Sequence, residues 1–244
     1  SFCGSDVGGF AGILKFILHD KKQFIRWMQS GVFYPFCRVH TATGTRHQDP
    51  FSYGEKAQEI SKKYIELRYE WFPYWYNLFQ KYHEKGAPIL RPLFYGTPED
   101  EKCHEKQFQN QFFLGKDVLV VPIDKRRIRE KKIYLPEGAW IHYWTLEEFQ
   151  GGKEHYIPIT LEDIPIFIRK GAILPTQPVV EYVGHEPIET VILKIFKGEA
   201  GTQTAIEVYD DDGESMEYVT NDMYCKLPIR CEFGEEGTNL TISK

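Results

Sequence analysis

The chain has 244 residues, of which 42% are hydrophobic and 15% aromatic, so it can bury the core of one large globular domain or of two to three small ones. Its net charge of −5, with acids and bases interspersed, provides no basic surface for nucleic acid or an anionic membrane and suits a neutral ligand. The longest apolar candidate, Ile13–Leu18, is interrupted by Lys15 and falls short of the about 20 residues that span a bilayer, so no membrane span is expected.

The first residues are predicted to be the end of a buried strand. The apolar pair Phe2–Cys3 runs into the glycine-rich segment Gly4–Gly9, which contains Asp6 and is followed by Phe10. Barrel enzymes and other α/β enzymes place their working residues in such loops. Asp6 is therefore either a turn-forming aspartate or a carboxylate that reaches a ligand hydroxyl or orients an arginine. Phe10 either packs in the core or offers an apolar ring face to a ligand.

A second candidate segment is Tyr34–His40, which is predicted to be extended after Pro35. Arg38 and His40 alternate along it, so they share one face and can enter the same cavity. A guanidinium group beside an imidazole suits the adjacent hydroxyls of a ligand. The alternatives are an ion pair between Arg38 and a carboxylate such as Asp6, and a purely structural role for His40.

The segment Glu55–Lys85 is predicted to be helical. Apolar residues recur at helical spacing in its first part, at Ile60, Tyr64, Leu67 and Trp71. Pro73 is expected to end or kink this helix, and a second helical stretch runs to Gly86, which suits a C-terminal cap. A strand is predicted next, at Pro88–Phe94. The order strand, loop, helix, strand is the βα rhythm of a barrel.

After Gln107 the pattern changes to short β-rich runs separated by turn residues. This spacing is typical of antiparallel sandwich domains. The predicted strands are Val118–Pro122, Lys132–Leu135, Trp140–Trp144, Tyr156–Ile159, Ile166–Ile168, Thr190–Phe196 and Ala205–Tyr209.

Two features invite a metal or disulfide interpretation, and neither has the required spacing. The five cysteines are scattered without a Cys-x-x-Cys pair, so we expect reduced thiols rather than a disulfide framework or a zinc site. The acidic run Asp210–Glu214 fails the calcium-loop spacing and is predicted to be a solvated hairpin turn. A metal-binding β protein remains the weakest of the alternatives.

Seven motifs occur in order along the chain: Gly4–Phe10, Arg26–Gln29, Tyr34–His40, Arg68–Tyr69, Arg91–Phe94, Phe112–Pro122 and Tyr209–Gly213. In this order they resemble the C-terminal portion of the family 31 glycoside hydrolases, the α-glucosidase family. The resemblance implies an α/β fold followed by β structure, with the last βα units of a (β/α)8 TIM barrel in residues 1–106. It further implies a proximal C-terminal β-sandwich in residues 107–178 and a distal β domain, expected to be truncated, in residues 179–244.

The resemblance also implies a retaining exo-α-glycosidase, an α-glucosidase, that removes terminal α-linked glucose from oligosaccharides or glycans. Retaining hydrolysis needs two carboxylates about 5 to 5.5 Å apart. In the family these lie in a Trp-x-Asp-Met-type and a Gly-Asp-Asn-type strand end, and neither motif occurs in the 244 residues. We therefore expect no catalytic residue here and assign substrate binding to His40, Arg38, Asp6 and Phe10. No cofactor or metal is implied, and the expected partners are the carbohydrate substrate and the upstream part of the same barrel.

A rival function is a non-catalytic carbohydrate-binding or interaction module derived from such an enzyme, since this module would also lack both carboxylates. Isolated barrel strands leave unpaired edges and an exposed apolar interior, which favours the enzyme. One departure from the family pattern is the connection Ala11–Asp20, which is longer and more apolar than usual and concerns the loop beside Phe10.

Overall fold

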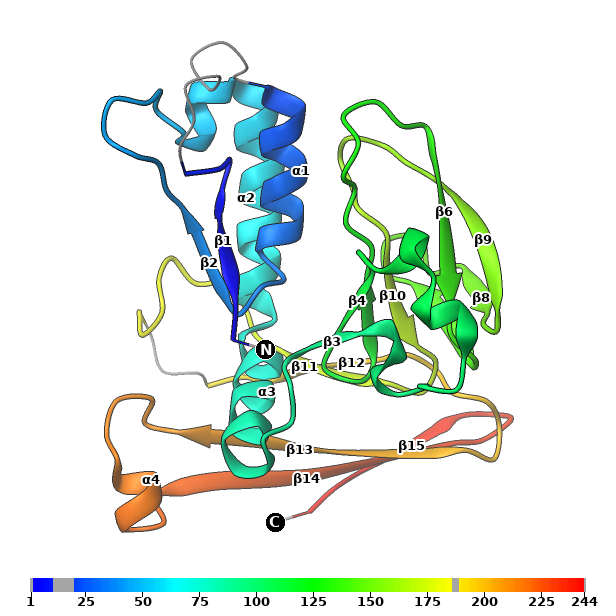
Figure 1. Ribbon diagram of the computed structural model, residues 1–244. Helices are drawn as coiled ribbons and strands as arrows, with labels where there is room; N and C mark the ends of the chain where they lie inside the picture. The colour runs from blue at the N-terminus through cyan, green and yellow to red at the C-terminus, as the bar shows by residue number, and fades with distance from the viewer. Residues whose placement is uncertain (1, 11–19, 186–188, 244) are drawn as a thin grey trace. The chain divides into compact units, whose positions relative to one another are not determined.

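The computed structural model describes residues 2–10, 20–185 and 189–243 (Figure 1). The chain forms two compact units, of which one comprises Ser1–Arg68 with Pro88–Ile168 and the other Tyr69–Ala87 with Arg169–Lys244. The domain boundaries expected after residues 106 and 178 stay predictions. Within the described ranges, no helix is both long enough and apolar enough to cross a membrane.

A parallel βαβ unit opens the chain. Strands β1 (Gly4–Val7) and β2 (Phe36–Val39) pair in parallel, and helix α1 (Lys21–Gly31) connects them (Figure 1). Asp20 caps α1, because its Oδ1 accepts hydrogen bonds from two backbone N–H groups of the first turn at 2.8 and 3.0 Å. The unusual connection falls mainly in residues 11–19, which lie outside the described residues. The predicted βα units are confirmed here.

The first strand begins later than the sequence indicates. Gly4–Val7, expected to be loop, forms β1. Gly4 is needed because a Cβ atom on it would lie 2.1 Å from the backbone oxygen of Phe36 on the neighbouring strand. The loop itself starts at Gly8 and Gly9, which both have φ of +85°, a conformation that favours glycine.

The predicted pair of helices is confirmed. Helix α2 (Glu55–Glu70) and helix α3 (Phe72–Lys85) are separated at the fully buried Trp71. Pro73 lies in the first turn of α3, where its missing N–H costs no helical hydrogen bond. Gly86 ends α3 in the left-handed conformation, with φ of +63°.

The strand expected at Pro88–Phe94 is present only as β3 (Leu90–Pro92), and its assignment to the barrel was wrong. It pairs antiparallel with β4 (Phe112–Leu114), so it is the first strand of the following antiparallel sheet. A 3₁₀ turn at Leu93–Tyr95 ends it. The order of strand, loop, helix and strand suggested a barrel strand, but a short apolar run does not indicate which sheet a strand joins.

The β-rich part of this unit is a sandwich of antiparallel strands. Its larger sheet has the order β3-β4-β5-β10-β7-β8, and a two-stranded sheet, β6-β9, accompanies it. The remaining strands are β5 (Val118–Val120), β6 (Glu130–Leu135), β7 (Ala139–His142), β8 (Glu148–Gln150), β9 (Lys153–Pro158) and β10 (Ile166–Arg169). Their shared core includes the buried residues Phe108, Leu119, Ile133, Trp140, Ile157 and Phe167.

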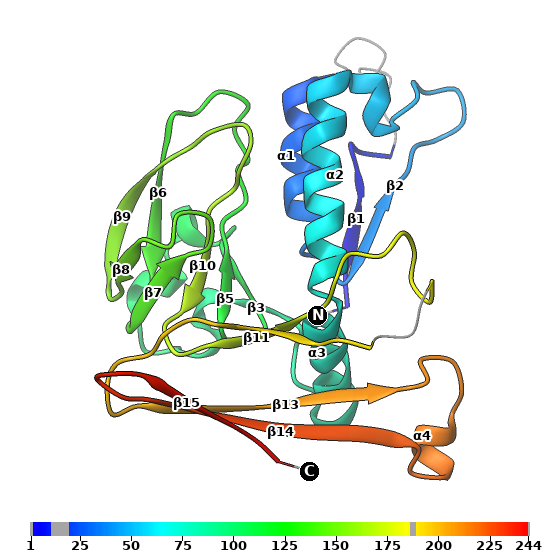
Figure 2. The same cartoon turned by 180° about the vertical axis from the view of Figure 1, so that it is seen from behind.

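The other unit packs α3 with antiparallel strands. The pair β11-β12 and the three-stranded sheet β13-β14-β15 supply its strands, and the short helix α4 lies in the connection between β13 and β14 (Figure 2). The element bounds are β11 (Ile173–Thr176), β12 (Ile192–Ile195), β13 (Gln203–Asp211), α4 (Glu217–Thr220), β14 (Tyr224–Phe233) and β15 (Thr238–Ile242). The strands expected at 190–196 and 205–209 are therefore present as β12 and β13.

The helices α1 and α2 pack with strand β1 around a core of buried side chains. Short 3₁₀ turns connect several of the elements. The buried residues include Val7, Phe24, Ile25, Met28, Phe33, Ile60 and Tyr64. The further 3₁₀ turns are Pro50–Tyr53, Glu101–His104 and Lys106–Phe108.

Candidate functional site

The structure brings the four predicted site residues together at the ends of β1 and β2. Asp6 and Arg38 stand opposite each other in the parallel register. Their side chains form an ion pair in which the Nε of Arg38 lies 2.5 Å from the Oδ1 of Asp6. The side chain of Arg38 is 47% exposed, whereas that of Asp6 is 18% exposed. The carboxylate therefore holds the guanidinium group while leaving part of it open to a ligand.

His40 and Phe10 form the other half of this cluster. Their rings stack with centroids 5.3 Å apart and an interplanar angle of 21°. Phe10 is 48% exposed. Its backbone oxygen accepts hydrogen bonds from the N–H of Ala42 at 2.9 Å and the Oγ1 of Thr41 at 3.2 Å, so the chain after β2 holds the loop after β1.

The cluster faces away from helix α1. Val7 is fully buried, and a Cβ atom built on Gly31 of α1 would come within 2.8 Å of it. Ser5 lies on the same face, where its Oγ accepts a hydrogen bond from the Nε1 of Trp27 at 2.7 Å. Because side chains alternate along a strand, Asp6 projects to the opposite face. In a closed barrel this opposite face is the interior.

Gln48 positions the two loops, and sequence reasoning did not find it. Its side chain is buried, and its Nε2 donates to the backbone oxygens of Gly9 at 2.9 Å and His40 at 3.1 Å. A Cβ atom on Gly8 would lie 2.1 Å from its Oε1. The side-chain amide of Gln48 therefore links the backbone next to Phe10 to the backbone of His40. No local pattern distinguishes Gln48 from an ordinary loop glutamine.

Arg68 positions the start of β2 from the last turn of α2. Its guanidinium donates to the backbone oxygens of Val32 at 2.6 Å, Tyr34 at 2.7 Å and Pro35 at 3.0 Å. These carbonyls belong to the turn between α1 and β2. The motif residue Arg68 thus acts on the backbone that delivers Arg38 and does not join the cluster.

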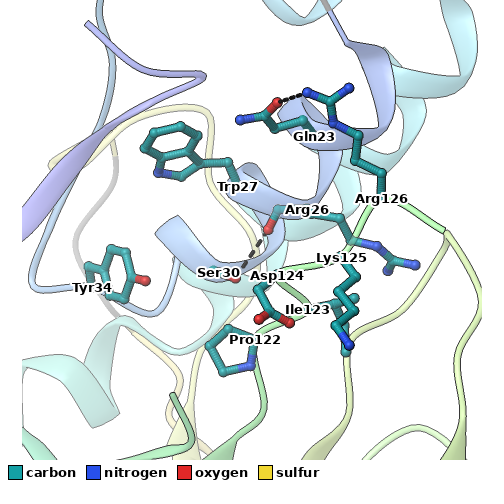
Figure 3. A pocket seen from close by; sticks show the side chains of 10 residues that line it. All are labelled: Gln23, Arg26, Trp27, Ser30, Tyr34, Pro122, Ile123, Asp124, Lys125 and Arg126. Atoms are coloured by element: carbon teal, nitrogen blue, oxygen red, sulfur yellow. Dashed lines mark hydrogen bonds between the residues drawn. The ribbon is translucent and has the colours of Figure 1, made fainter. Parts of the chain in front are cut away.

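A hollow of about 320 Å³ lies between α1 and the segment Pro122–Arg126, and none of the four predicted residues lines it (Figure 3). Arg26 in its wall is buried, and its NH2 donates to the backbone oxygen of Thr160 at 2.5 Å. The NH2 of Arg126 donates to the Oε1 of Gln23 at 3.2 Å (Figure 3). These contacts fasten α1 to the β-sandwich, which gives the Arg26–Gln29 motif a structural role.

The acidic run Asp210–Glu214 is a turn only in its second half, because Asp210 and Asp211 end strand β13 and Asp212–Glu214 lie in the connection after it. Asp212 accepts hydrogen bonds from the backbone N–H groups of Glu214 at 3.1 Å and Ser215 at 3.0 Å. In the described part of the chain, no group of three or more His, Cys, Asp or Glu side chains is placed to hold a metal ion. The five cysteines are free thiols, as expected.

The side chains of the cluster are of the kinds that suit a polyhydroxyl ligand. Arg38 supplies a cationic hydrogen-bond donor, His40 an imidazole, and Phe10 an apolar ring face at one edge. It does not supply the pair of carboxylates, one an acid and one a nucleophile, that glycoside cleavage requires, because Asp6 is engaged by Arg38. The arrangement is therefore suited to binding and orientation.

Two family models match the chain in sequence. Residues 1–78 match the glycosyl hydrolases family 31 TIM-barrel domain, and residues 86–174 match the glycosyl hydrolase family 31 C-terminal domain.

Relatives and solved structures of the same family align with nearly the whole chain. Alpha-glucosidase 2 of Bacillus thermoamyloliquefaciens is 40% identical over 98% of this chain, which spans 29% of that protein. The alpha-xylosidase of Saccharolobus solfataricus is 33% identical over 98% of this chain, which spans 32% of that protein. The structure of a family 31 dextranase from Flavobacterium johnsoniae superposes with a TM-score of 0.92 at 34% identity, over 99% of this chain and 29% of that one. The chain thus spans less than a third of these proteins and belongs to glycoside hydrolase family 31, as a C-terminal portion of its enzymes.

Proposed function

We propose that the intact protein is a retaining exo-α-glycosidase that hydrolyses terminal α-linked glucose, and that this chain supplies part of its sugar-binding wall. The observation that carries the proposal is the cluster of Asp6, Arg38, His40 and Phe10 on one side of a parallel βαβ unit. Three chain segments, Gly4–Phe10, Phe36–His40 and the Gln48 loop, converge on it. Such convergence is expected of a binding site at a barrel end.

Glucose is the sugar that the relatives support best. The relative at 40% identity is named an α-glucosidase and the structure at 34% identity is named a dextranase, so both names point to glucose-containing substrates. An α-xylosidase matches at 33% identity. Xylose lacks the C6 hydroxymethyl group of glucose. Comparing the turnover of an aryl α-glucoside with that of the matching aryl α-xyloside therefore tells which sugar the protein prefers.

The residues of this chain act by binding in the proposed reaction. His40 and Arg38 would donate hydrogen bonds to sugar hydroxyls, and these bonds strengthen as positive charge develops on the ring in the transition state. Phe10 would pack on the apolar edge of the sugar, with its ring fixed by His40. Asp6 keeps the Arg38 guanidinium group oriented. The nucleophile and the acid would come from the upstream part of the barrel, because neither of their two motifs occurs in the 244 residues.

Replacing His40 tests the proposal. In the intact protein, His40→Ala is expected to lower kcat/KM for an aryl α-glucoside by at least about tenfold, or about 1.4 kcal/mol of transition-state stabilisation. Asp212→Ala is the control, because Asp212 accepts only turn hydrogen bonds, and its kcat/KM should equal that of the wild type. NMR of the first product should show the α-anomer, as retention requires.

Three outcomes would overturn parts of this proposal. Equal kcat/KM for His40→Ala and the wild type would remove the site assignment. Binding of α-glucosides without any turnover by the intact protein would replace the enzyme with the rival carbohydrate-binding module. Faster turnover of the α-xyloside than of the α-glucoside would keep the reaction and change the sugar.

A further inference from the structure

A groove in the second compact unit has the composition of a sugar-binding surface. It has a volume of about 470 Å³ and lies between α3 and the β13–α4–β14 segment. Ligand sites typically range from about 300 to 1,000 Å³. Six aromatic residues line it: Tyr76, Phe79, Tyr82, Tyr209, Tyr218 and Tyr224. None of the residues of the β1–β2 cluster contributes to it.

The floor of the groove is held by a network of hydrogen bonds between α3 and β13. Asp211 accepts hydrogen bonds from the hydroxyls of Tyr76 and Tyr209, and from the N–H of Gly213 at 2.9 Å. The Oδ1 of Asn77, in α3, accepts from the N–H of Tyr209 in β13 at 2.7 Å. Burial raises the pKa of both tyrosines above the usual value, so the hydroxyls stay protonated donors. The groove is therefore preformed.

The rim of the groove is aromatic, exposed and supplied with free polar groups. Tyr82 is 41% exposed and Tyr224 is 42% exposed. The ring of Tyr218 meets that of His83 edge-on at 5.9 Å. Within the described residues, the hydroxyls of Tyr82, Tyr218 and Tyr224 have no hydrogen-bond partner. Ring faces combined with unsatisfied hydroxyls match the apolar and polar faces of a pyranose.

Asp222 adds an acceptor to this rim. Its φ of +52° is a left-handed conformation that few residues other than glycine adopt, and it lines the groove. Local backbone strain of this kind collects at ligand sites. In the part of the chain that the structure describes, its carboxylate has no hydrogen-bond partner. The strained turn thus presents a carboxylate to the groove.

The charge of the groove selects among ligands. Asp211, Asp222 and Glu84 line it, and the nearby Lys226 is paired with Glu84 at 2.8 Å. An acidic lining repels phosphates, nucleotides and other anions, and it accepts hydrogen bonds from neutral hydroxyls. A polyhydroxyl chain fits both properties.

We propose that this groove between α3 and α4 is a carbohydrate-binding site for a neutral α-linked glucan chain, with Tyr82 and Tyr224 as its stacking platforms. The choice of an α-glucan as the ligand rests on the proposed function. The groove would hold a polymeric or oligomeric substrate on the protein, in addition to the terminal sugar that the β1–β2 cluster takes.

Affinity electrophoresis and calorimetry of the intact protein test this site, with maltoheptaose and dextran as the probes. Tyr82→Ala with Tyr224→Ala should weaken glucan binding by at least tenfold, because both aromatic platforms for the sugar rings are lost. The matched control is Tyr156→Ala in β9, where the tyrosine is 62% exposed and lies outside the groove. Tyr82→Phe with Tyr224→Phe keeps both rings and should retain most of the affinity, which separates stacking from a folding defect.

The outcomes separate this site from the proposed activity. Glucan binding that persists in His40→Ala and is lost in the double alanine variant supports the groove, even if the protein cleaves no α-glucoside. Unchanged glucan binding in the double alanine variant, or an equal loss in Tyr156→Ala, overturns it while leaving the activity intact. A change from dimer to monomer in the double variant, with unchanged glucan binding, would assign the aromatic rim to self-association and also overturn it.

Discussion

Arg38 shows how a single residue can satisfy two interpretations of the sequence. An ion pair with Asp6 and direct contact with a ligand were alternatives, and the structure shows the ion pair. With 47% of its side chain exposed, Arg38 keeps donors that Asp6 does not use. Because the guanidinium group has several N–H donors in one plane, orientation by a carboxylate and binding to hydroxyls are compatible. Its contact with sugar stays a prediction.

Gln48 is the residue whose replacement tests the positioning of the cluster. Gln48→Glu keeps the side-chain shape and removes both N–H donors, so a carboxylate would face the backbone oxygens of Gly9 and His40. We expect kcat/KM of the intact enzyme for an aryl α-glucoside to fall about tenfold, with KM raised, since leaving buried polar groups without a hydrogen-bond partner costs about 1 to 3 kcal/mol.

The control for this change is Gln58→Glu, because Gln58 is exposed on helix α2. It introduces the same charge and should leave kcat/KM unaltered. A Gln48→Glu enzyme with a lower Tm and wild-type kcat/KM would show that Gln48 serves stability alone.

The grouping of the four candidate residues could be predicted from the sequence, whereas the residue that positions them, Gln48, could not. Asp6, Arg38, His40 and Phe10 are found together because each lies at a strand end or on one strand face, a relation that spacing reveals. Gln48 bonds to backbone oxygens far along the chain, and any loop polar residue has the same appearance in sequence.

Among the secondary-structure elements, helix α3 owes its sharp end to Gly86. Its φ of +63° is left-handed, and a Cβ atom there would meet nothing within 4 Å. Gly86→Ala should therefore destabilise the fold through backbone strain alone, by about 1 to 2 kcal/mol. Thermal unfolding of the intact protein should show a lower midpoint.

Gly96 provides the matched comparison. It ends a 3₁₀ turn with φ of −98°, and a Cβ atom there also meets nothing within 4 Å. Gly96→Ala should stabilise by about 0.4 to 1 kcal/mol, because alanine restricts the unfolded chain and tolerates this conformation. Equal midpoints for the two variants would contradict the assignment of strain to Gly86.

The helices were easier to predict than the strands. The spacing of Ile60, Tyr64 and Leu67 identifies one face of α2, and all three are buried. Strand β14 alternates buried and exposed positions from Ile229 to Phe233, yet Pro228 within it resembles a break. Pro228 precedes the part of β14 that pairs with β15, so its missing N–H costs little. Whether a proline interrupts a strand depends on which neighbouring strands pair with it, and a single sequence does not show this pairing.

At the scale of the whole molecule, the proposed separation of sugar binding and bond cleavage along the chain follows from the two strands that the chain contributes. The two parallel strands β1 and β2 present Phe36 and Arg38 on one face, and Phe36 is 42% exposed. In a closed barrel such a face meets side chains from the other strands. The reacting carboxylates of the proposed enzyme belong on those other strands, since their two motifs are absent from the 244 residues.

The 244-residue chain by itself is therefore expected to release no glucose from maltose or from a fluorogenic α-glucoside. Circular dichroism and a cooperative unfolding transition should first establish that the isolated chain retains its β structure, so that a missing activity is not a missing fold. The isolated chain would keep the binding residues. Retaining hydrolysis needs two carboxylates about 5 to 5.5 Å apart, and Asp6, which is paired with Arg38, does not provide such a pair. Glucose release that His40→Ala abolishes in the isolated chain would place the reacting pair within these residues and refute the division of labour.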